Sequence, residues 1–247
     1  MASTSETGHI INIENYKLVI DRCVGFGTDY QPANEALIIV NMTGQWTDVK
    51  AAHDTYLDKL EDTKQPVDDR EDMFDELRSR TTRVNNIYGS TKATARMKKD
   101  AAGLVKKILG SNVKIPRLEG GVPDPKYVSN SQQSFVKKID NFRQLVLLLA
   151  GDGNYAPNET IFKIVTLETF LEDLEAKNLS VEETLGKAIH FRQLRDHGLY
   201  DLEIGVIDTV LMCKKYVKGL YGATSDEAKS VTGIKFRRVM KLKPVVS

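Results

Sequence analysis

Residues 13–32 read IENYKLVIDRCVGFGTDYQP, and the same order of side-chain types returns at residues 139–157 as IDNFRQLVLLLAGDGNYAP. Each stretch begins with Ile, carries an Asn beside an aromatic residue, and then reaches two glycines followed by Tyr and Pro. An internal repeat decides the architecture of a chain, so it is weighed before any local pattern. We interpret the two stretches as copies of one ancestral segment.

Two later landmarks keep the same order. An Ile-Val pair at residues 39–40 returns at residues 164–165, and IYGST from Ile87 returns as LYGAT from Leu220. Four landmarks in one order are seldom a coincidence. The sequence therefore predicts a tandem duplication.

The two predicted halves are residues 1–112 and 130–247. Residues 113–129, which lie between them, contain three prolines and a Gly-Gly pair. Because Pro and Gly interrupt helices, this segment is predicted to be a linker.

The Gly, Tyr and Pro residues at 25–32 and 151–157 are predicted to form a turn in each half, which we call the Tyr-Pro corner. Apolar residues after each corner recur at spacings of three and four, the period of an α-helix. This pattern predicts a long helix with one apolar seam in each half, and His53 and Asn178 occupy the equivalent polar step. The seam positions are Ile39, Met42, Trp46, Val49, His53, Tyr56 and Leu60 in the first half, and Ile164, Leu167, Leu171, Leu174 and Asn178 in the second.

Further helices flank these two. One precedes each corner, and in the first half a third begins near Pro66, a residue suited to a first helical turn. Gly89 and Gly222 are predicted to end the third helices, and shorter fourth helices are predicted at residues 91–109 and 225–242. We therefore predict an all-α protein in which each half is an up-and-down bundle of about four helices.

Two segments of the second half depart from this simple plan. Residues 234–242 nearly alternate in polarity and are compatible with a strand, but we favour a helix because the counterpart at residues 99–109 is helical in pattern. Ser180 and Glu183 form a capping box, which predicts a break and an additional helix.

Composition excludes several classes of protein. The 247 residues carry a net charge of +1, so no global field attracts nucleic acid or an anionic membrane. The two cysteines, Cys23 and Cys213, form no zinc or redox motif and are expected to be buried thiols in a reducing compartment.

The longest apolar run, at residues 145–151, is too short to span a bilayer, and the N-terminus lacks the features of a signal peptide. We expect a soluble protein, cytoplasmic at first, with later release left open.

The stretch GDGNYAPNETIFKIV at residues 151–165 resembles a calcium loop or a phosphate loop at first sight. A calcium loop that starts at Asp152 would need Gly and Glu where Pro157 and Lys163 stand. A phosphate loop would need Lys after its glycines, and this stretch offers none at that place. We interpret it as a turn between helices, with Tyr155 packed in the corner.

Catalytic patterns are equally weak. A di-iron bundle needs a Glu-x-x-His motif on each of two helices, and the sequence has this motif only at residues 6–9; a GxSxG nucleophile elbow is missing. His53 is expected to be a hydrogen-bonded histidine of the core or of an interface, whereas His190 and His197 are expected near a helix end in solvated or capping roles. The sequence therefore predicts no catalytic residue, no metal site, no cofactor and no small-molecule substrate, and we expect a protein that is not an enzyme.

Charge is distributed unevenly, with an acidic stretch at residues 58–76 and basic stretches at residues 92–107 and 229–243. Docking of a basic fourth helix on the acidic face, within a chain or between chains, would fix the register of an assembly. The candidate interaction residues are Lys92, Arg96, Lys98, Lys99, Arg237, Arg238 and Lys241 on the basic side, and Asp68, Asp69 and Asp72 on the acidic side.

Three functions are compatible with these features. The first is a helical scaffold that forms a homo-oligomer or polymer through its charged faces. The second is binding of nucleic acid or an anionic membrane by the basic fourth helices. The third is a membrane-active toxin, for which the apolar residues 145–149 are the only indication.

The opening GHIINIENYKLVIDRCVGFGTDYQPANEALIIV and the repeat NFRQLVLLLAGDGNYAPNETIFKIVTLETFL together resemble a group of bacterial proteins of similar length that have no assigned activity. In that group an Asn-aromatic helix precedes a Gly, Tyr and Pro corner and a long Leu-rich helix. The resemblance covers most of the chain. It implies the two-bundle architecture and no catalytic residue.

Overall fold

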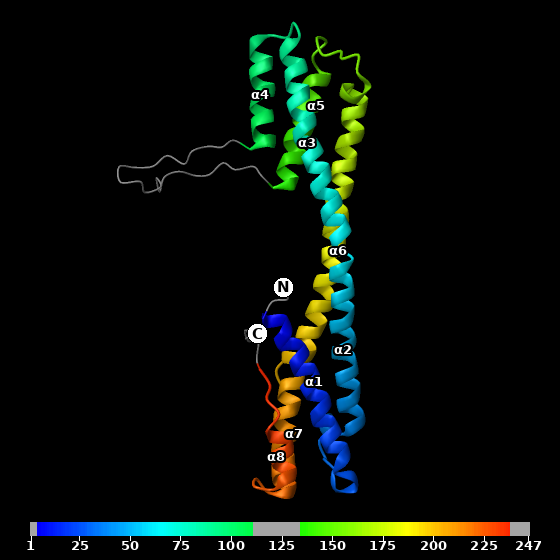
Figure 1. Cartoon of the computed structure of the whole chain (residues 1–247), viewed down its shortest axis with the longest axis vertical. Helices are drawn as coiled ribbons and strands as arrows, with labels where there is room; N and C mark the ends of the chain where they lie inside the picture. The colour runs from blue at the N-terminus through cyan, green and yellow to red at the C-terminus, as the bar shows by residue number, and fades with distance from the viewer. Residues whose placement is uncertain (1–3, 111–133, 238–247) are drawn as a thin grey trace, which may run out of the picture. The chain divides into compact units, whose positions relative to one another are not determined.

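The computed structural model describes residues 4–110 and 134–237, and these residues form helices and no strand (Figure 1). The predicted all-α class is confirmed. The linker predicted at residues 113–129 lies outside the described residues. The α-helices are α1 (Thr4–Gly25), α2 (Ile39–Glu61), α3 (Lys64–Ser90), α4 (Ala95–Leu109), α5 (Phe135–Ala150), α6 (Ile164–Tyr200), α7 (Val206–Tyr221) and α8 (Asp226–Thr232).

The chain forms two compact units that do not coincide with the predicted halves at residues 1–112 and 130–247. Unit 1 consists of Met1–Glu61 and Leu185–Ser247, and unit 2 consists of Asp62–Thr184. The division differs because α7 and α8 pack on α1, whereas α4 packs on α5. Each unit thus combines helices from both predicted halves.

The Tyr-Pro corners have the same construction in both units. Tyr30 donates its hydroxyl hydrogen to the carbonyl of Leu37 at 3.0 Å, and Tyr155 does the same to Phe162 at 2.9 Å. Each carbonyl belongs to a short 3₁₀ turn just before a long helix. Gly27 adopts a φ of +61°, which favours glycine, at the first corner. The prediction that Tyr155 packs in the turn between helices is confirmed.

The third helix of each predicted half meets the corner of the other half. In unit 2 the ring of Tyr88 on α3 packs edge-on against Tyr155, with 6.0 Å between ring centroids. In unit 1 Tyr216 on α7 packs edge-on against Tyr30 at 5.4 Å. The core of each unit therefore forms around a tyrosine corner and an aromatic residue from the other half of the sequence.

Helix α6 is continuous, so the break predicted at Ser180 is wrong. The apolar seam continues through Val181 and Ala188, which are both buried. Ser180 does not start a new helix. Its carbonyl accepts a hydrogen bond from the hydroxyl of Thr184 at 3.0 Å within α6. Gly198 also lies inside α6, although the sequence suggested a helix end there.

Gly198 permits close packing of α6 on α2 in unit 1. A Cβ added at residue 198 would lie 2.4 Å from Cγ2 of Val49. We expect Gly198→Ala to cost about 1–3 kcal/mol, because overpacking displaces a buried side chain or the backbone. Urea unfolding of Gly198→Ala beside Gly186→Ala, whose added Cβ would have no neighbour within 4 Å, measures this cost. Equal stability of the two variants would contradict the close approach.

The ends of the third and fourth helices differ in part from expectation. Gly222 ends α7 with a φ of +88°, as predicted, but α3 continues through Gly89 to Ser90. Helix α8 ends at Thr232, so the helix predicted at residues 225–242 is wrong at residues 233–237. These described residues do not form a strand either. Residues 238–242 lie outside the described part of the chain.

Candidate functional site

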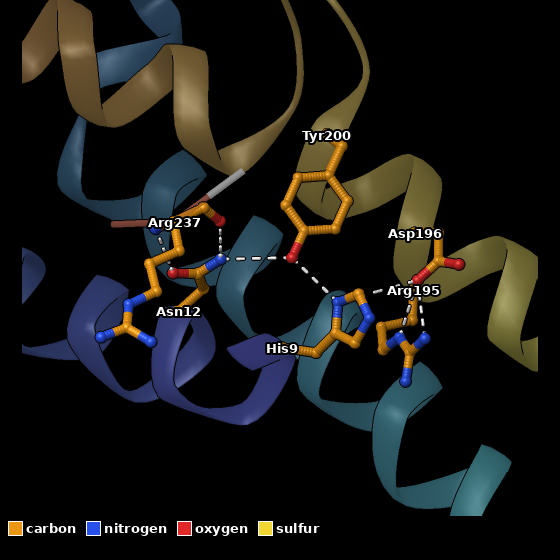
Figure 2. A network of polar contacts seen from close by, with 6 residues as sticks. All are labelled: His9, Asn12, Arg195, Asp196, Tyr200 and Arg237. Carbon is orange, nitrogen blue, oxygen red and sulfur yellow. Dashed lines mark hydrogen bonds and ion pairs between the residues drawn. The ribbon is translucent and has the colours of Figure 1, made fainter. Parts of the chain in front are cut away.

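A buried polar network occupies the N-terminal part of α1 and the C-terminal end of α6 in unit 1 (Figure 2). The hydroxyl oxygen of Tyr200 lies 2.8 Å from Nδ1 of His9 and accepts a hydrogen bond from Nδ2 of Asn12 at 3.2 Å. A Tyr hydroxyl both donates and accepts, so it can pair with either tautomer of His9. The three side chains are each less than a tenth exposed, so their hydrogen bonds offset the cost of burying them.

Arg195 and Asp196 extend the network on the side of His9. Nε and Nη2 of Arg195 donate to Oδ1 of Asp196 at 2.9 Å and 2.7 Å, and this oxygen lies 3.9 Å from Nδ1 of His9. Only 1% of Arg195 is exposed, and its guanidinium carbon lies 5.0 Å from the ring centroid of Tyr56. A buried guanidinium needs such partners, because desolvation of an uncompensated charge is costly.

On its other side the network holds the chain segment that follows α8. Nδ2 of Asn12 donates to the carbonyl of Arg237 at 2.7 Å, and the amide of Arg237 donates back to Oδ1 of Asn12 at 3.0 Å. Asn15, one turn further along α1, donates to the carbonyl of Lys235 at 2.8 Å. Asn12 and Asn15 thus bind the backbone of alternate residues, as a neighbouring strand would.

Side chains of the same segment alternate between core and solvent. Ile234 and Phe236 pack against the apolar core of unit 1, while Lys235 and Arg237 are exposed. Nζ of Lys214 donates to the carbonyl of Ile234 and lies 5.3 Å from the ring centroid of Phe236. The arrangement fixes this segment of the chain through its backbone and two apolar side chains.

The sequence did not reveal this network. His9 and Asn12 lie one helical turn apart, but Tyr200 is 191 residues beyond His9, and the three belong to no local motif. The Asn at position 15 was noted only as a landmark of the repeat. The alternation of residues 234–237 was the one local signal, and it was outweighed by analogy with the helical segment at residues 99–109.

Two of the predicted interaction residues already have partners inside unit 2. Nζ of Lys98 donates to the carbonyls of Gly89 and Thr91 at 2.8 Å and 2.7 Å, and so caps the end of α3. Oδ2 of Asp69 pairs with Nζ of Lys177 at 2.7 Å, and the hydrogen bond from Lys177 lowers the pKa of Asp69. The cation on Asp69 therefore comes from α6 and not from a fourth helix.

The other candidates remain on the surface or lie outside the described residues. Asp68 and Asp72 of α3 are exposed, as are Lys92, Arg96 and Lys99 around the start of α4. Arg237 has its main chain held by Asn12, as described above. Arg238 and Lys241 lie outside the described part of the chain.

The histidines of the seam and of α6 have distinct environments. His53 is buried on α2, as expected of a core residue, and Asn178 at the equivalent step is buried on α6, where it donates to Glu182 at 2.8 Å. His190 is exposed, and Nδ1 of His197 lies 2.9 Å from Asp201 near the end of α6.

Asp152, the residue that suggested a calcium loop, has its carboxylate directed at protein donors. Its two oxygens accept from the hydroxyl of Tyr88 at 2.6 Å and from the amide and side chain of Asn154 at 3.0 Å and 2.7 Å. The hydrogen bond from Tyr88 lowers the pKa of Asp152, and burial raises the pKa of Tyr88 to about 12. The carboxylate thus joins α3 to the corner after α5.

This carboxylate predicts a loss of stability in acid. Because the folded-state pKa of Asp152 lies below its ordinary value of 3.8, its contribution is present above about pH 4 and disappears as the pH falls through the folded pKa. We expect the free energy of unfolding to fall more steeply below about pH 4 for the native chain than for Asp152→Asn. Urea unfolding at several pH values measures both slopes, and parallel slopes would contradict the role of Asp152.

Groups of three or more His, Cys, Asp or Glu side chains that could hold a metal ion are absent from residues 4–110 and 134–237. Within the same residues, no helix is both long enough and apolar enough to cross a membrane. The residues that suggested membrane activity, 145–149, include Leu145 and Leu149, which are buried in unit 2.

Comparison of the chain with models of known protein families, with curated proteins and with solved structures finds no match.

Proposed function

We propose that the protein is a non-enzymatic helical scaffold that associates with further copies of itself through two oppositely charged surfaces of unit 2. The acidic surface consists of Asp68, Glu71, Asp72 and Asp75 on the first half of α3. The basic surface consists of Lys92, Arg96 and Lys99 around the start of α4. All of these residues are exposed. The observation that carries the proposal is the distance between the two surfaces.

The two surfaces lie near opposite ends of α3. Lys98 fixes the first turn of α4 to the carbonyl of Gly89, near the last turn of α3, whereas Asp69 lies in its second turn. At a rise of 1.5 Å per residue, residues 69 and 89 are about 30 Å apart along the helix axis. This exceeds the Debye length of about 8 Å at physiological salt, so the surfaces of one copy of unit 2 cannot neutralise each other.

Two of the four arginines of α3 turn away from the acidic surface. The guanidinium of Arg70 lies 4.0 Å from the ring centroid of Phe135, and that of Arg80 lies 3.9 Å from the centroid of Phe170. Both arginines thus turn toward aromatic rings of α5 and α6, where the cation–π attraction holds them. Asp68 and Asp72, one turn apart, face outward on the remaining side of the helix.

Contact between an acidic end and a basic end is heterologous, because different surfaces meet. Two copies in contact would together keep one unused acidic surface and one unused basic surface, so the contact repeats and builds a filament or closes into a ring. The charges would set the rate and register of association more than its affinity. A scaffold of this kind would need no catalytic group.

We also infer that the chain arose by duplication of one four-helix segment whose copies exchanged partners. The matched hydrogen bonds of Tyr30 and Tyr155 support this inference. So do the edge-on contacts of Tyr216 and Tyr88, which bring a third helix from the opposite half to each corner. In this account the third and fourth helices of each copy pack on the other copy. Neither copy then forms a bundle by itself.

Binding of nucleic acid or anionic membrane through the basic surface is the alternative function. The exposed cations Lys92, Arg96 and Lys99 favour it, but residues 92–99 include no aromatic side chain on which a base could stack. Both functions depend on the same cations. Only self-association also depends on the acidic surface.

Light scattering after size exclusion, over a range of protein and salt concentrations, tests the proposal. We expect the mass-average mass to rise with concentration at low salt and to return to that of one chain at high salt. Asp68→Lys with Asp72→Lys should abolish the rise, whereas Glu168→Lys with Glu172→Lys, on the exposed face of α6, should not. A constant monomer mass would contradict self-association. If the variant with Asp68→Lys and Asp72→Lys still binds DNA or anionic vesicles, the result would favour the alternative function.

A further inference from the structure

The two cysteines of the chain meet inside unit 1. The sulfur atoms of Cys23 on α1 and Cys213 on α7 lie 3.5 Å apart, although the residues are far apart in sequence. Cys23 is 1% exposed and Cys213 is fully buried. Both thiols are free. From this geometry we propose that Cys23 and Cys213 are a site of covalent modification, at which oxidation forms a disulfide that links α1 to α7.

Packing alone does not require thiols at these positions. In the repeat, Cys23 aligns with Leu149, which is buried beside the corner of Tyr155 in unit 2. Cys213 aligns with Arg80, whose guanidinium packs on Phe170. Unit 2 thus builds the same corner without sulfur. The thiol pair is particular to unit 1, where it spans the contact between two helices from opposite halves of the sequence.

The surroundings distinguish the two thiols. The hydrogen bond from Cys23 lowers the pKa of Cys213, and the hydroxyl of Tyr30, 3.6 Å from Sγ of Cys213, and the charge of Lys214 act in the same direction. The bond to Cys213 and burial raise the pKa of Cys23. Cys213 therefore supplies the thiolate that attacks first, since the thiolate is the nucleophilic form.

The oxidant in this reaction is a small-molecule disulfide, such as oxidised glutathione. The thiolate of Cys213 attacks one glutathione sulfur, a mixed disulfide forms, and one glutathione thiolate leaves. That thiolate takes the proton of Cys23. The Cys23 thiolate then attacks Sγ of Cys213 and releases the second glutathione. Two protein thiols are oxidised, and one glutathione disulfide is reduced to two thiols.

Little movement separates the reduced and linked forms. A disulfide has an S–S length of about 2.0 Å, so the two sulfur atoms must approach by about 1.5 Å. Because both thiols are buried, glutathione reaches Cys213 only when the contact between α1 and α7 opens. The linked form prevents this opening. The reaction is therefore slow to begin and stabilises unit 1 once complete.

The test uses the full-length folded chain equilibrated with reduced and oxidised glutathione at several ratios, then quenched in acid. We expect a product lighter by about 2 Da, with Cys23 linked to Cys213 by peptide mapping and with an unchanged helical circular dichroism signal. Its unfolding midpoint should lie above that of the reduced chain, because the link closes a long loop in the unfolded state.

Cys23→Ser and Cys213→Ser, each checked for native circular dichroism, are the controls. Each should lack the internal link and the rise in midpoint, although it can carry one glutathione, heavier by about 305 Da. The proposal is overturned if the folded chain keeps two free thiols at every ratio while the denatured chain forms the link. A link that lowers the unfolding midpoint would overturn it as well.

Discussion

Phe142→Ala is expected to destabilise unit 2 by about 3–5 kcal/mol. We expect it to increase hydrogen exchange in α3 and α4, which end more than thirty residues before position 142. Phe142 is completely buried on α5, and its ring packs edge-on against Phe170 with 5.9 Å between centroids. The substitution leaves a large cavity in the core shared with α3 and α4. Hydrogen exchange should therefore increase in α3 and α4, whereas α1 and α7 should keep their protection.

Ile20→Ala is the matched change in unit 1. Ile20 is buried on α1, in the core that includes α7 and α8, so its loss should weaken protection in those helices by the same cavity mechanism. The pair of variants separates two arrangements of the chain. If each half were a bundle, Phe142→Ala would expose α7 and α8 and leave α3 protected. That outcome would contradict the exchanged packing.

The sequence predicted the helices and corners well because their signals are local. The spacing of apolar residues fixes which face of a helix is buried, and the order of Gly, Tyr and Pro fixes the corner. The exchange of partners had no such signal. Two related halves present similar apolar seams, so periodicity shows that Leu77 and Val210 are buried but not on which copy each packs.

The errors at Ser180 and at residue 232 have opposite causes. A capping box favours a helix start only where the chain is free to turn, and the buried Val181 keeps α6 continuous there. At residue 232 a local signal was present and correct. Ile234 and Phe236 pack inward while their neighbours face solvent, as the alternating pattern indicated.

Asp196→Ala is expected to be the most damaging single change in the polar network of unit 1. It removes the carboxylate that accepts two hydrogen bonds from the buried guanidinium of Arg195. Removal of one partner of a buried ion pair costs about 3–5 kcal/mol, and we expect the lower end because 13% of the Asp196 side chain is exposed. Urea unfolding measures the loss.

A double-mutant cycle provides the control for this prediction. Arg195→Met removes the charge and keeps an apolar side chain of similar length, so Arg195→Met with Asp196→Ala should be more stable than Asp196→Ala alone. Additive effects of the two substitutions would show that the pair does not act as a unit. A cost of less than about 1 kcal/mol for Asp196→Ala would contradict the structural role of the network.

Mixing of two charge-reversed variants tests self-association most directly. One variant carries Asp68→Lys and Asp72→Lys, and the other carries Lys92→Glu, Arg96→Glu and Lys99→Glu, so Asp69 and Lys98 keep their internal contacts. The first variant has no net acidic surface and the second has no basic surface, so each variant alone should remain a single chain in light scattering. An equimolar mixture at low salt should form assemblies that dissociate at high salt. A mixture that stays at the mass of one chain would contradict the proposed contact between acidic and basic surfaces.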